Sequence, residues 1–257
     1  MKQPLRTLVL ALCCGLAAAC TQRPEHLKLM SYNIRNGIGI DNIQDIGRIA
    51  RVILREAPDL VALQELDSAT LRVDGRYIPG ELGRMTGMHA TFGRAIGFAG
   101  GSYGVGLLSR TEPLAVRSTP LPGREEARVL LMAEFPDYTV CVTHLSLTPE
   151  DRHASLPLIL QATDTCRKPV LLAGDFNTGD AAAVLAGLGG GFRILSDTTR
   201  MTFPSDNPAV RIDYILGRGL PTSATVTESA VDHTGTASDH CPLWVTLAWK
   251  RGKQPRK

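Results

Sequence analysis

An apolar run from Val170 to Ala173 leads into Gly174 and stops at Asp175, and Asn177 follows two residues later. Short runs rich in Val and Leu are typical of buried strands, and side chains at i and i+2 on an extended chain point to the same side. We therefore expect Asp175 and Asn177 to emerge together at the end of a core strand. A carboxylate beside an amide can take a proton from water and hold a developing oxyanion, which are the tasks that hydrolysis of a phosphate ester requires. The alternative is a strand that simply runs into an Asp/Asn turn.

A strand, a helix and a second strand are predicted at the start of the mature chain. Residues 27–33 alternate apolar and polar and end at an amide. From an N-cap at Asp41 or Asn42, apolar residues recur at helical spacing until Pro58. Residues 60–65 then form another apolar run that ends in an acid. Both predicted strands therefore end in a side chain that can ligate a metal.

The rest of the chain alternates apolar runs and polar loops. Residues 67–102 show no clear period and are predicted to be loops around a short helix near residues 80–86. Strands are expected over residues 103–110, 129–135, 138–147, 211–216 and 242–249. The strand over residues 211–216 has an acid inside it. A helix is predicted over residues 180–191, and another over 149–166, where Pro157 should kink the helix or delay its start.

The formal charge of +3 is concentrated at the two ends of the chain. Lys2 and Arg6 lie in a leader and five basic residues lie in the last eight positions, so residues 20–249 keep 21 basic against 25 acidic residues. A body of that sign lacks the broad basic footprint of proteins that track duplex nucleic acid. With 257 residues, 44% of them hydrophobic, we expect one domain over residues 27–249 and a basic, disordered tail over 250–257.

The first 19 residues have the layout of an export signal. A basic start precedes an apolar stretch that is too short to cross a bilayer, and Ala17 to Ala19 precede Cys20. This order resembles a bacterial lipobox, which implies a lipidated Cys20, a tether over residues 20–26 and a cell-envelope lipoprotein of the periplasm or outer membrane. Leu16 stands four residues before the cysteine rather than three. Cleavage after Ala19 and simple secretion are therefore the alternative.

Three internal cysteines, Cys141, Cys166 and Cys241, stand in separate sequence contexts. They are expected to be buried small hydrophobes rather than a disulfide framework or a zinc site.

Seven short motifs follow one another in a characteristic order. They are Ser-Tyr-Asn33-Ile, Leu-Gln-Glu65, Gly-Val-Gly-Leu-Leu-Ser-Arg110, Thr-His144, Gly-Asp175-Phe-Asn177, Arg-Ile-Asp213-Tyr-Ile and Ser-Asp239-His240. Together they resemble the endonuclease/exonuclease/phosphatase superfamily, over nearly all of the mature chain. The resemblance implies an α/β fold: a four-layer sandwich of two packed mixed sheets flanked by helices, with the active site at one edge.

The resemblance also implies roles for single residues. Asn33, Glu65 and Asp239 would form a site for Mg²⁺ or Mn²⁺, which prefer such hard oxygen ligands. Asp175 would orient or deprotonate the attacking water, and Asn177 would hold a phosphate oxygen. His240, oriented by Asp213, would donate to the phosphate, and His144 would lie near the leaving group. The alternative for each histidine is a structural residue bonded to the backbone.

Two further residues, Arg128 and Tyr103, are candidates for substrate binding, and an exposed loop arginine is the alternative for Arg128. His89, His153 and His233 match no motif and are expected at the surface.

The function expected from these features is metal-dependent hydrolysis of a phosphodiester or phosphomonoester. Lipid head groups or small phosphoesters suit the export signal, the acidic body and a membrane anchor at Cys20 best, and the protein is expected to be a monomer. A secreted Mg²⁺-dependent nuclease acting on DNA or RNA is the first alternative. A non-catalytic binding module of the same fold is the second.

Overall fold

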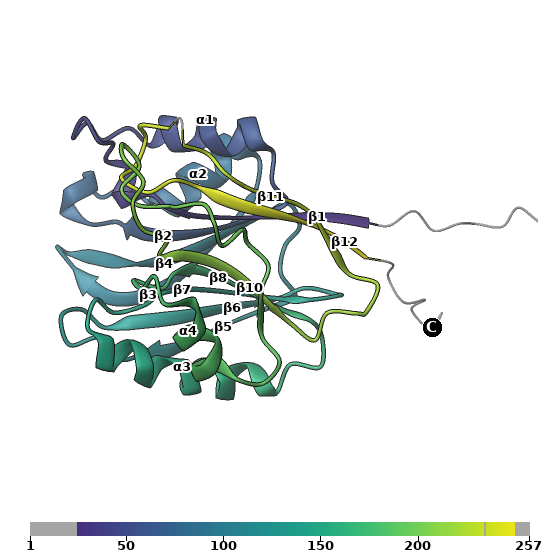
Figure 1. The fold of residues 1–257 in the computed structure, drawn as a ribbon. Helices are drawn as coiled ribbons and strands as arrows, with labels where there is room; N and C mark the ends of the chain where they lie inside the picture. Colours follow the sequence, from purple (N-terminus) through teal and green to yellow (C-terminus); the bar gives the residue numbers. More distant parts are fainter. Residues whose placement is uncertain (1–24, 234, 250–257) are drawn as a thin grey trace, which may run out of the picture.

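Two six-stranded sheets pack face to face in the computed structural model, which describes residues 25–233 and 235–249 (Figure 1). The first sheet has the order β11 (Thr225–Val231), β12 (Leu243–Trp249), β1 (Glu25–Asn33), β2 (Leu60–Ser68), β4 (Gly101–Ser109), β3 (His89–Phe98). The second has the order β5 (Ala115–Leu121), β6 (Arg128–Glu134), β7 (Thr139–His144), β8 (Val170–Asp175), β10 (Asp213–Arg218), β9 (Arg193–Ile194). With parallel and antiparallel pairs in each sheet, the predicted four-layer α/β sandwich is confirmed.

Helices form the two outer layers. Helices α1 (Ile46–Glu56) and α2 (Ile78–Thr86) cover the first sheet, and α3 (Pro149–Asp164) and α4 (Ala181–Leu188) cover the second (Figure 1). Short 3₁₀ turns, η1 (Arg35–Gly37) and η2 (Leu71–Val73), follow β1 and β2.

The N-cap predicted for α1 is wrong by one turn. Asp45 caps the helix, because its side chain accepts from the backbone N–H of Arg48. Asp41 instead accepts from the backbone N–H of Ile43 in a local turn, and 59% of Ile43 is exposed.

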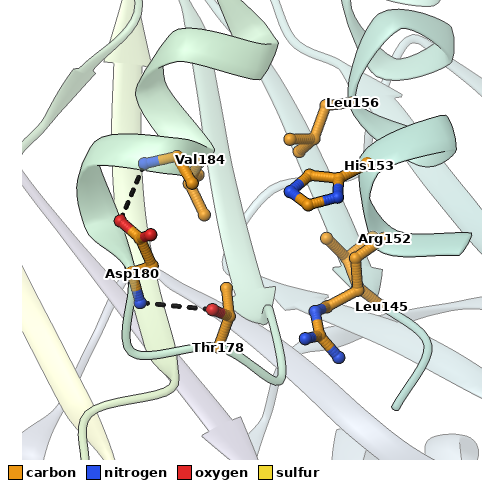
Figure 2. A pocket seen from close by; sticks show the side chains of 8 residues that line it. Leu145, Arg152, His153, Leu156, Thr178, Asp180 and Val184 are labelled. Carbon is orange, nitrogen blue, oxygen red and sulfur yellow. Dashed lines mark hydrogen bonds between the residues drawn. The ribbon is translucent and has the colours of Figure 1, made fainter. Parts of the chain in front are cut away.

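Helix α4 begins at a polar N-cap, whereas helix α3 begins at a proline. Asp180 caps α4 by accepting from the N–H of Ala183. Its own N–H donates to Thr178 Oγ1 (Figure 2). Helix α3 starts at Pro149 and continues through Pro157, so the delayed start, one of the two predicted effects of Pro157, does not occur.

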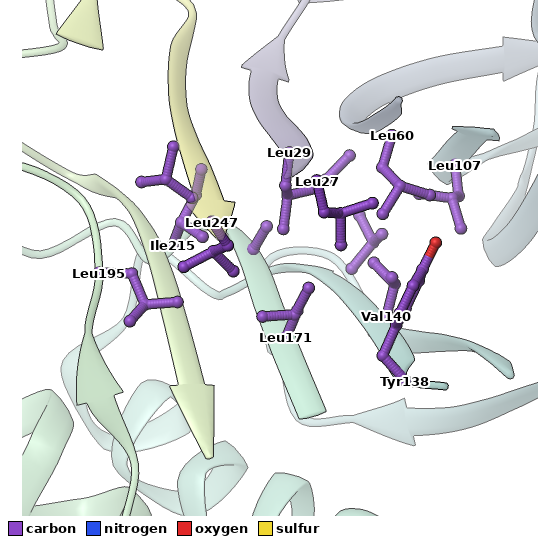
Figure 3. Packing of buried hydrophobic residues seen from close by; sticks show 14 of the residues in the cluster. Leu27, Leu29, Leu60, Leu107, Tyr138, Val140, Leu171, Leu195, Ile215 and Leu247 are labelled. Atoms are coloured by element: carbon purple, nitrogen blue, oxygen red, sulfur yellow. The ribbon is translucent and has the colours of Figure 1, made fainter. Parts of the chain in front are cut away.

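The main core lies between the sheets (Figure 3). Leu29 and Leu60 of the first sheet meet Leu171 and Ile215 of the second, and none of the four is more than 1% exposed. Met30, the next residue along β1, points to the other face and packs under α1 and α2. Because side chains alternate between the two faces of each strand, one apolar layer lies between the sheets and one lies between each sheet and its helices.

Residues 1–24, 234 and 250–257 lie outside the described part of the chain, and with them the predicted export signal, the lipidated Cys20, most of the tether and the basic tail. Within the described residues, no helix is long and apolar enough to span a membrane.

The strands that sequence analysis did not predict, β3, β5, β9 and β11, are the edge strands of the two sheets. Most residues of β5 and β11 are exposed, so these strands carry no buried apolar alternation that a sequence pattern could reveal. The prediction that residues 67–102 are loops around one helix is therefore wrong for β3.

Gly174 allows β7 and β8 to lie side by side where they deliver His144 and Asp175. A Cβ atom at Gly174 would lie 2.0 Å from the carbonyl oxygen of Thr143, its partner across the strands. We expect Gly174→Ala to lower the free energy of unfolding by about 1–3 kcal/mol, as overpacking does, in thermal or urea denaturation. Gly179→Ala is the control, because the added Cβ would meet Arg211 O at an ordinary 3.7 Å. Equal stability of the two variants would contradict this account.

Candidate active site

The direction of the strands brings the predicted polar residues to one edge of the sandwich. Parallel β1 and β2 run toward this edge, as do parallel β7 and β8, whereas β10 and β12 begin there. The edge therefore collects the last residues of β1, β7 and β8, the first residue of β10 and the two residues that precede the turn into β12. These are Asn33, His144, Asp175, Asp213, Asp239 and His240.

The prediction that Glu65 ends its strand is wrong, because Glu65 lies on a bulge within β2. The pairing of β2 with β4 shifts register between Leu63 and Leu66, and Glu65 has φ 59°. A bulge of this kind turns one side chain out of the alternating pattern. The Glu65 carboxylate thereby reaches Asn33, whose Nδ2 donates to Oε1 over 2.9 Å.

Asp175 is the centre of the cluster. Its Oδ2 accepts from Asn33 Nδ2 at 3.1 Å and lies 3.5 Å from His144 Nε2 and 3.6 Å from His240 Nε2. Burial and the neighbouring charge of Asp213, which is paired with Asp175 across β8 and β10, raise the pKa of Asp175. A carboxylate in this setting is a stronger base than one in water.

His240 is held by Asp213. Its Nδ1 lies 2.9 Å from Asp213 Oδ2, and the Phe203 ring packs 4.8 Å from the imidazole. Burial disfavours the imidazolium, but the charge of Asp213 and this hydrogen bond outweigh it and raise the pKa of His240 to about 10. His240 is therefore protonated at neutral pH.

The prediction that Asp213 lies inside its strand is wrong, because Asp213 is the first residue of β10. Arg211 donates to the Asp197 carbonyl and lies over the Tyr214 ring.

His144 has the opposite protonation state. It is buried at the end of β7, while Asp213, which binds His240, begins β10 on the other side of β8. Burial lowers the pKa of His144 to about 4. One carboxylate thus lies between a neutral and a charged imidazole.

Asn177 reaches the site by another route than the one predicted. Strand β8 ends at Asp175, and Asn177 lies beyond it at φ 51°, so the two side chains do not leave one extended strand. The Asn177 N–H donates to Asp175 Oδ1 at 2.8 Å, and its Nδ2 donates to Leu145 O at 2.8 Å. The segment is therefore an Asp/Asn turn, as the alternative predicted, and the turn also places Asn177 beside Asp175.

These residues border a cavity of about 350 Å³. Its wall includes Glu65, Tyr103, Arg128, His144, Asp175, Asn177, Asp239 and His240, and also Glu126, Leu147, Phe203 and Ile212, which sequence analysis did not single out. Burial and the charge of Glu65 raise the pKa of Tyr103, so its hydroxyl stays protonated.

Arg128 is a buried residue at the start of β6 and not an exposed loop arginine. Its Nη1 donates to Glu126 Oε1 at 2.8 Å and its Nη2 to Glu125 Oε1 at 3.3 Å. The guanidinium thus reaches the cavity wall already paired with two carboxylates.

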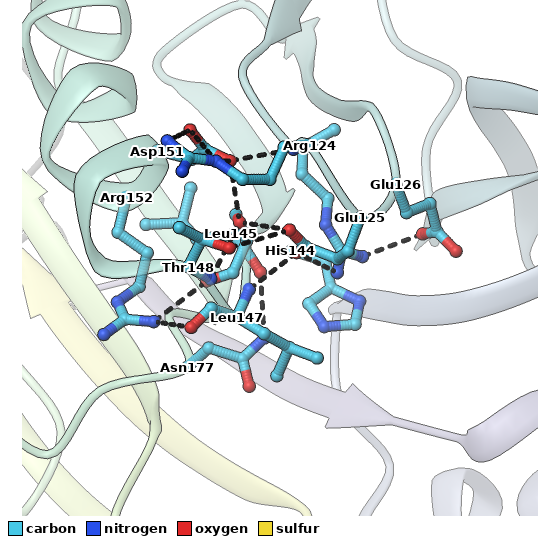
Figure 4. A network of polar contacts seen from close by, with 12 residues as sticks. Arg124, Glu125, Glu126, His144, Leu145, Leu147, Thr148, Asp151, Arg152 and Asn177 are labelled. Carbon is cyan, nitrogen blue, oxygen red and sulfur yellow. Dashed lines mark hydrogen bonds and ion pairs between the residues drawn. The ribbon is translucent and has the colours of Figure 1, made fainter.

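Glu125 fixes the loop that follows His144 (Figure 4). It accepts from Leu147 N at 2.7 Å, Ser146 Oγ at 2.8 Å and Thr148 Oγ1 at 3.2 Å. Partial burial opposes ionisation, but these bonds and Arg128 lower the pKa of Glu125 from 4.5 to about 2. No sequence motif marks this residue, because its partners are brought together only by the fold.

We expect Glu125→Gln to lower the free energy of unfolding at pH 7 by about 1 kcal/mol, since the network is partly exposed and screened by solvent. The folded-state pKa is the lower one, so the stabilisation is present above about pH 4.5 and is lost as the pH falls toward 2. Urea denaturation of both proteins from pH 7 to 2 should show the difference shrinking in that window. Glu112→Gln, at an exposed position, is the control. A difference that stays constant with pH would refute the assignment.

Two sets of side chains offer ligands for a divalent cation. Asp175, Asp213 and His240 bring possible ligand atoms within 4.8 Å of one another, but His240 Nδ1 and Asp213 Oδ2 are already hydrogen-bonded to each other. Asn33, Glu65 and Asp239 offer oxygen ligands only. Asn33 Nδ2 now faces Glu65 and Oδ1 accepts from Arg35 N, so the amide would have to turn over to ligate. Asp239 lies 3.6 Å from Arg35 Nε. The oxygen set fits Mg²⁺ or Mn²⁺ better.

His89, His153 and His233 are exposed, as predicted. Cys141 and Cys241 are buried free thiols and Cys166 is a partly buried one, so no disulfide joins the cysteines of the described chain.

Comparison with known proteins gives one family match and many matches of fold. A family model described as "Endonuclease/Exonuclease/phosphatase family" matches residues 30–240. The chain is 24% identical to an endonuclease/exonuclease/phosphatase from Beutenbergia cavernae DSM 12333, over 88% of this chain and 72% of that one, with a TM-score of 0.67. It is 18% identical to the mannosyl-6-phosphatase Bt3783 of Bacteroides thetaiotaomicron VPI-5482, over 87% and 100%, with a TM-score of 0.66. It is 22% identical to D. rerio TDP2 complexed with a single-strand DNA product, over 86% and 98%, with a TM-score of 0.63. At these identities the structures show a shared fold.

Proposed function

The chain belongs to the endonuclease/exonuclease/phosphatase family, and on that basis we propose that it is a divalent-metal-dependent phosphoesterase. The family comprises hydrolases that act on phosphoester bonds. The observation that supports the proposal is the position of Asp175 Oδ2, which lies 3.5 Å from His144 Nε2 and 3.6 Å from His240 Nε2.

In this proposal Asp175 acts on the attacking water. Its raised pKa makes it a better proton acceptor than an exposed aspartate, and a base is most effective when its pKa approaches the working pH. The Asn177 N–H donates to Asp175 Oδ1 and fixes the direction of the carboxylate.

His240 stabilises the charge that grows on the phosphoryl oxygens. Asp213 binds Nδ1 and leaves Nε2 directed toward Asp175 and the cavity. A charged donor fixed in advance stabilises a transition state without reorganisation. The second hydrogen of the Asn177 amide can bind another phosphate oxygen, because the first is used by Leu145 O.

His144 is assigned to the leaving-group side, opposite His240 across Asp175. A neutral imidazole there can donate a hydrogen bond to the departing oxygen. Arg128 and Tyr103, on the same cavity wall, are assigned to substrate binding.

Asn33, Glu65 and Asp239 would hold the metal ion. When bound, Mg²⁺ or Mn²⁺ would supply Lewis-acid stabilisation of the phosphate charge.

Lipid head groups or other small phosphoesters are the proposed substrates. Besides the proposed metal ligands, Glu126 and Asp175 border the cavity, and the Arg128 guanidinium is already paired, so few basic side chains are free to contact the successive phosphates of a polyanion. The mannosyl-6-phosphatase among the structures of the same fold supports a small phosphoester.

A nuclease is the second candidate, and the similar TDP2 structure with single-strand DNA product supports it. A non-catalytic binding module is disfavoured, because the carboxylates and imidazoles needed for hydrolysis converge. Export and attachment to the cell envelope through Cys20, with simple secretion as the alternative, remain predictions from the leader sequence.

A first experiment tests Asp213 and His240 as a unit. We expect Asp213→Ala and His240→Ala each to lower kcat by at least roughly two orders of magnitude, the scale for removal of one transition-state donor. The double variant should be little worse than the poorer single one, because residues that act together are non-additive. The substrate is the best of a panel of plasmid DNA, RNA, sphingomyelin, inositol phosphates and bis(p-nitrophenyl) phosphate. Thermal melts and the exposed His233→Ala serve as controls. Multiplicative losses, or unfolding of Asp213→Ala, would count against the pair.

A second experiment tests the metal. EDTA should abolish hydrolysis, and Mg²⁺ or Mn²⁺ should restore it. Glu65→Gln keeps the shape of the side chain and removes its charge, so the metal concentration for half-maximal rate should rise, whereas Glu112→Gln should not change it. Undiminished activity in EDTA would refute the metal assignment, and an unchanged titration of Glu65→Gln would move the ligand to another residue.

A further inference from the structure

A second cavity, of about 200 Å³, lies between the first turns of α3 and α4, outside the proposed catalytic cavity. Thr178, Asp180 and Val184 form one wall, and Arg152, His153 and Leu156 face them, with Leu145 below (Figure 2). The helices close it at one end, because a Cβ atom at Gly187 would lie 2.3 Å from Leu156 Cδ1. We call it the α3–α4 pocket.

Two loop segments, one after β7 and one after β8, border both this pocket and the catalytic cavity. Leu145 of the pocket follows His144, and Thr178 follows Asn177. Leu147 lines the catalytic cavity, and its carbonyl accepts from Arg152 of the pocket. His144 and Asn177 therefore line the catalytic cavity, and the residue that follows each of them lines the pocket.

The residues that line the pocket indicate which kind of ligand it can bind. Leu145, Leu156 and Val184 give an apolar floor, while the rim carries one guanidinium and one carboxylate, Arg152 and Asp180. These charges balance, which disfavours a second phosphate. None of the lining residues is Phe, Tyr or Trp, which disfavours a quaternary ammonium group, since that group favours aromatic cages.

Polar groups on both sides of the rim can form hydrogen bonds with the hydroxyl groups of a ligand. Asp180 Oδ1 accepts from Ala183 N, and its other oxygen and the His153 ring make no hydrogen bond within the described chain. A hydroxyl both donates and accepts, so it can bridge a carboxylate and an imidazole or guanidinium. The volume is below the roughly 300–1,000 Å³ of sites for drug-sized ligands, so the pocket has room for one ring.

We propose that the α3–α4 pocket is a substrate subsite for an uncharged, hydroxyl-rich ring, a sugar or a cyclitol, carried on the His144 side of the scissile phosphoester. This inference rests on the proposed phosphoesterase function and specifies its substrate class.

The test fills the pocket without touching the catalytic cavity. Ala183 lines the pocket, whereas its neighbour Ala182 is exposed and does not, so Ala183→Leu and Ala182→Leu form a matched pair. Asp180→Asn keeps an N-cap side chain and removes the charge. Each protein is assayed with mannose 6-phosphate and glycerophosphoinositol, which carry a ring, and with glycerol 3-phosphate and glycerophosphoglycerol, which do not.

We expect Ala183→Leu to lower kcat/KM for a ring-bearing substrate by about tenfold or more, the scale of discrimination by pocket contacts. The acyclic substrates should change less than twofold, and Ala182→Leu should change neither class. Asp180→Asn should raise KM for the ring-bearing substrates alone. The two ring-bearing compounds distinguish a sugar from a cyclitol.

Equal losses for both substrate classes would mean distortion of the site and overturn the subsite, as would no loss for either. A wild-type protein that hydrolyses the acyclic compounds, bis(p-nitrophenyl) phosphate or DNA, but neither ring-bearing compound, would overturn the subsite and leave the phosphoesterase intact. Failure on all of these substrates with Mg²⁺ or Mn²⁺ present would overturn the proposed function itself.

Discussion

The contact of Asp175 with its three neighbours is the constraint on which the edge of this sandwich depends. A buried carboxylate is costly unless hydrogen bonds and opposite charge compensate it. Here an amide from the first sheet, a neutral imidazole from β7 and a charged imidazole held through β10 share the task. Because these groups come from both sheets, the packing of one sheet on the other also sets the geometry of the proposed chemistry.

The two imidazoles differ in charge for a reason that no motif contains. Both are buried, and burial alone lowers the pKa of a histidine, as it does for His144. His240 escapes this because Asp213, the residue paired with Asp175 across β8 and β10, accepts its Nδ1 hydrogen. Asp213 therefore has two effects: it makes Asp175 more basic, and it keeps the imidazole of His240 charged.

Sequence analysis located the central strands and the residues at their ends, because apolar runs that stop at polar residues are local features. It missed the edge strands β3, β5, β9 and β11, whose half-solvated faces carry no such pattern. It named Arg128 but not Glu125 and Glu126, which pair with it. It also named Asp175 and Asn177 for a partly wrong reason, since a left-handed turn rather than strand alternation places Asn177. Contacts between distant segments depend on the tertiary structure, and a pattern along the chain cannot contain them.

The bulge in β2 has a further consequence for how this protein can change. Leu63 and Leu66 both pack into the core under α1 and α2 although they are three residues apart, because the shift in register absorbs the residues between them. The side chain at position 65 is thus released from the core, although its φ of 59° favours residues that tolerate a left-handed backbone. Mutational drift at this position can remodel the chemistry of the edge while the hydrophobic packing of the sandwich stays intact.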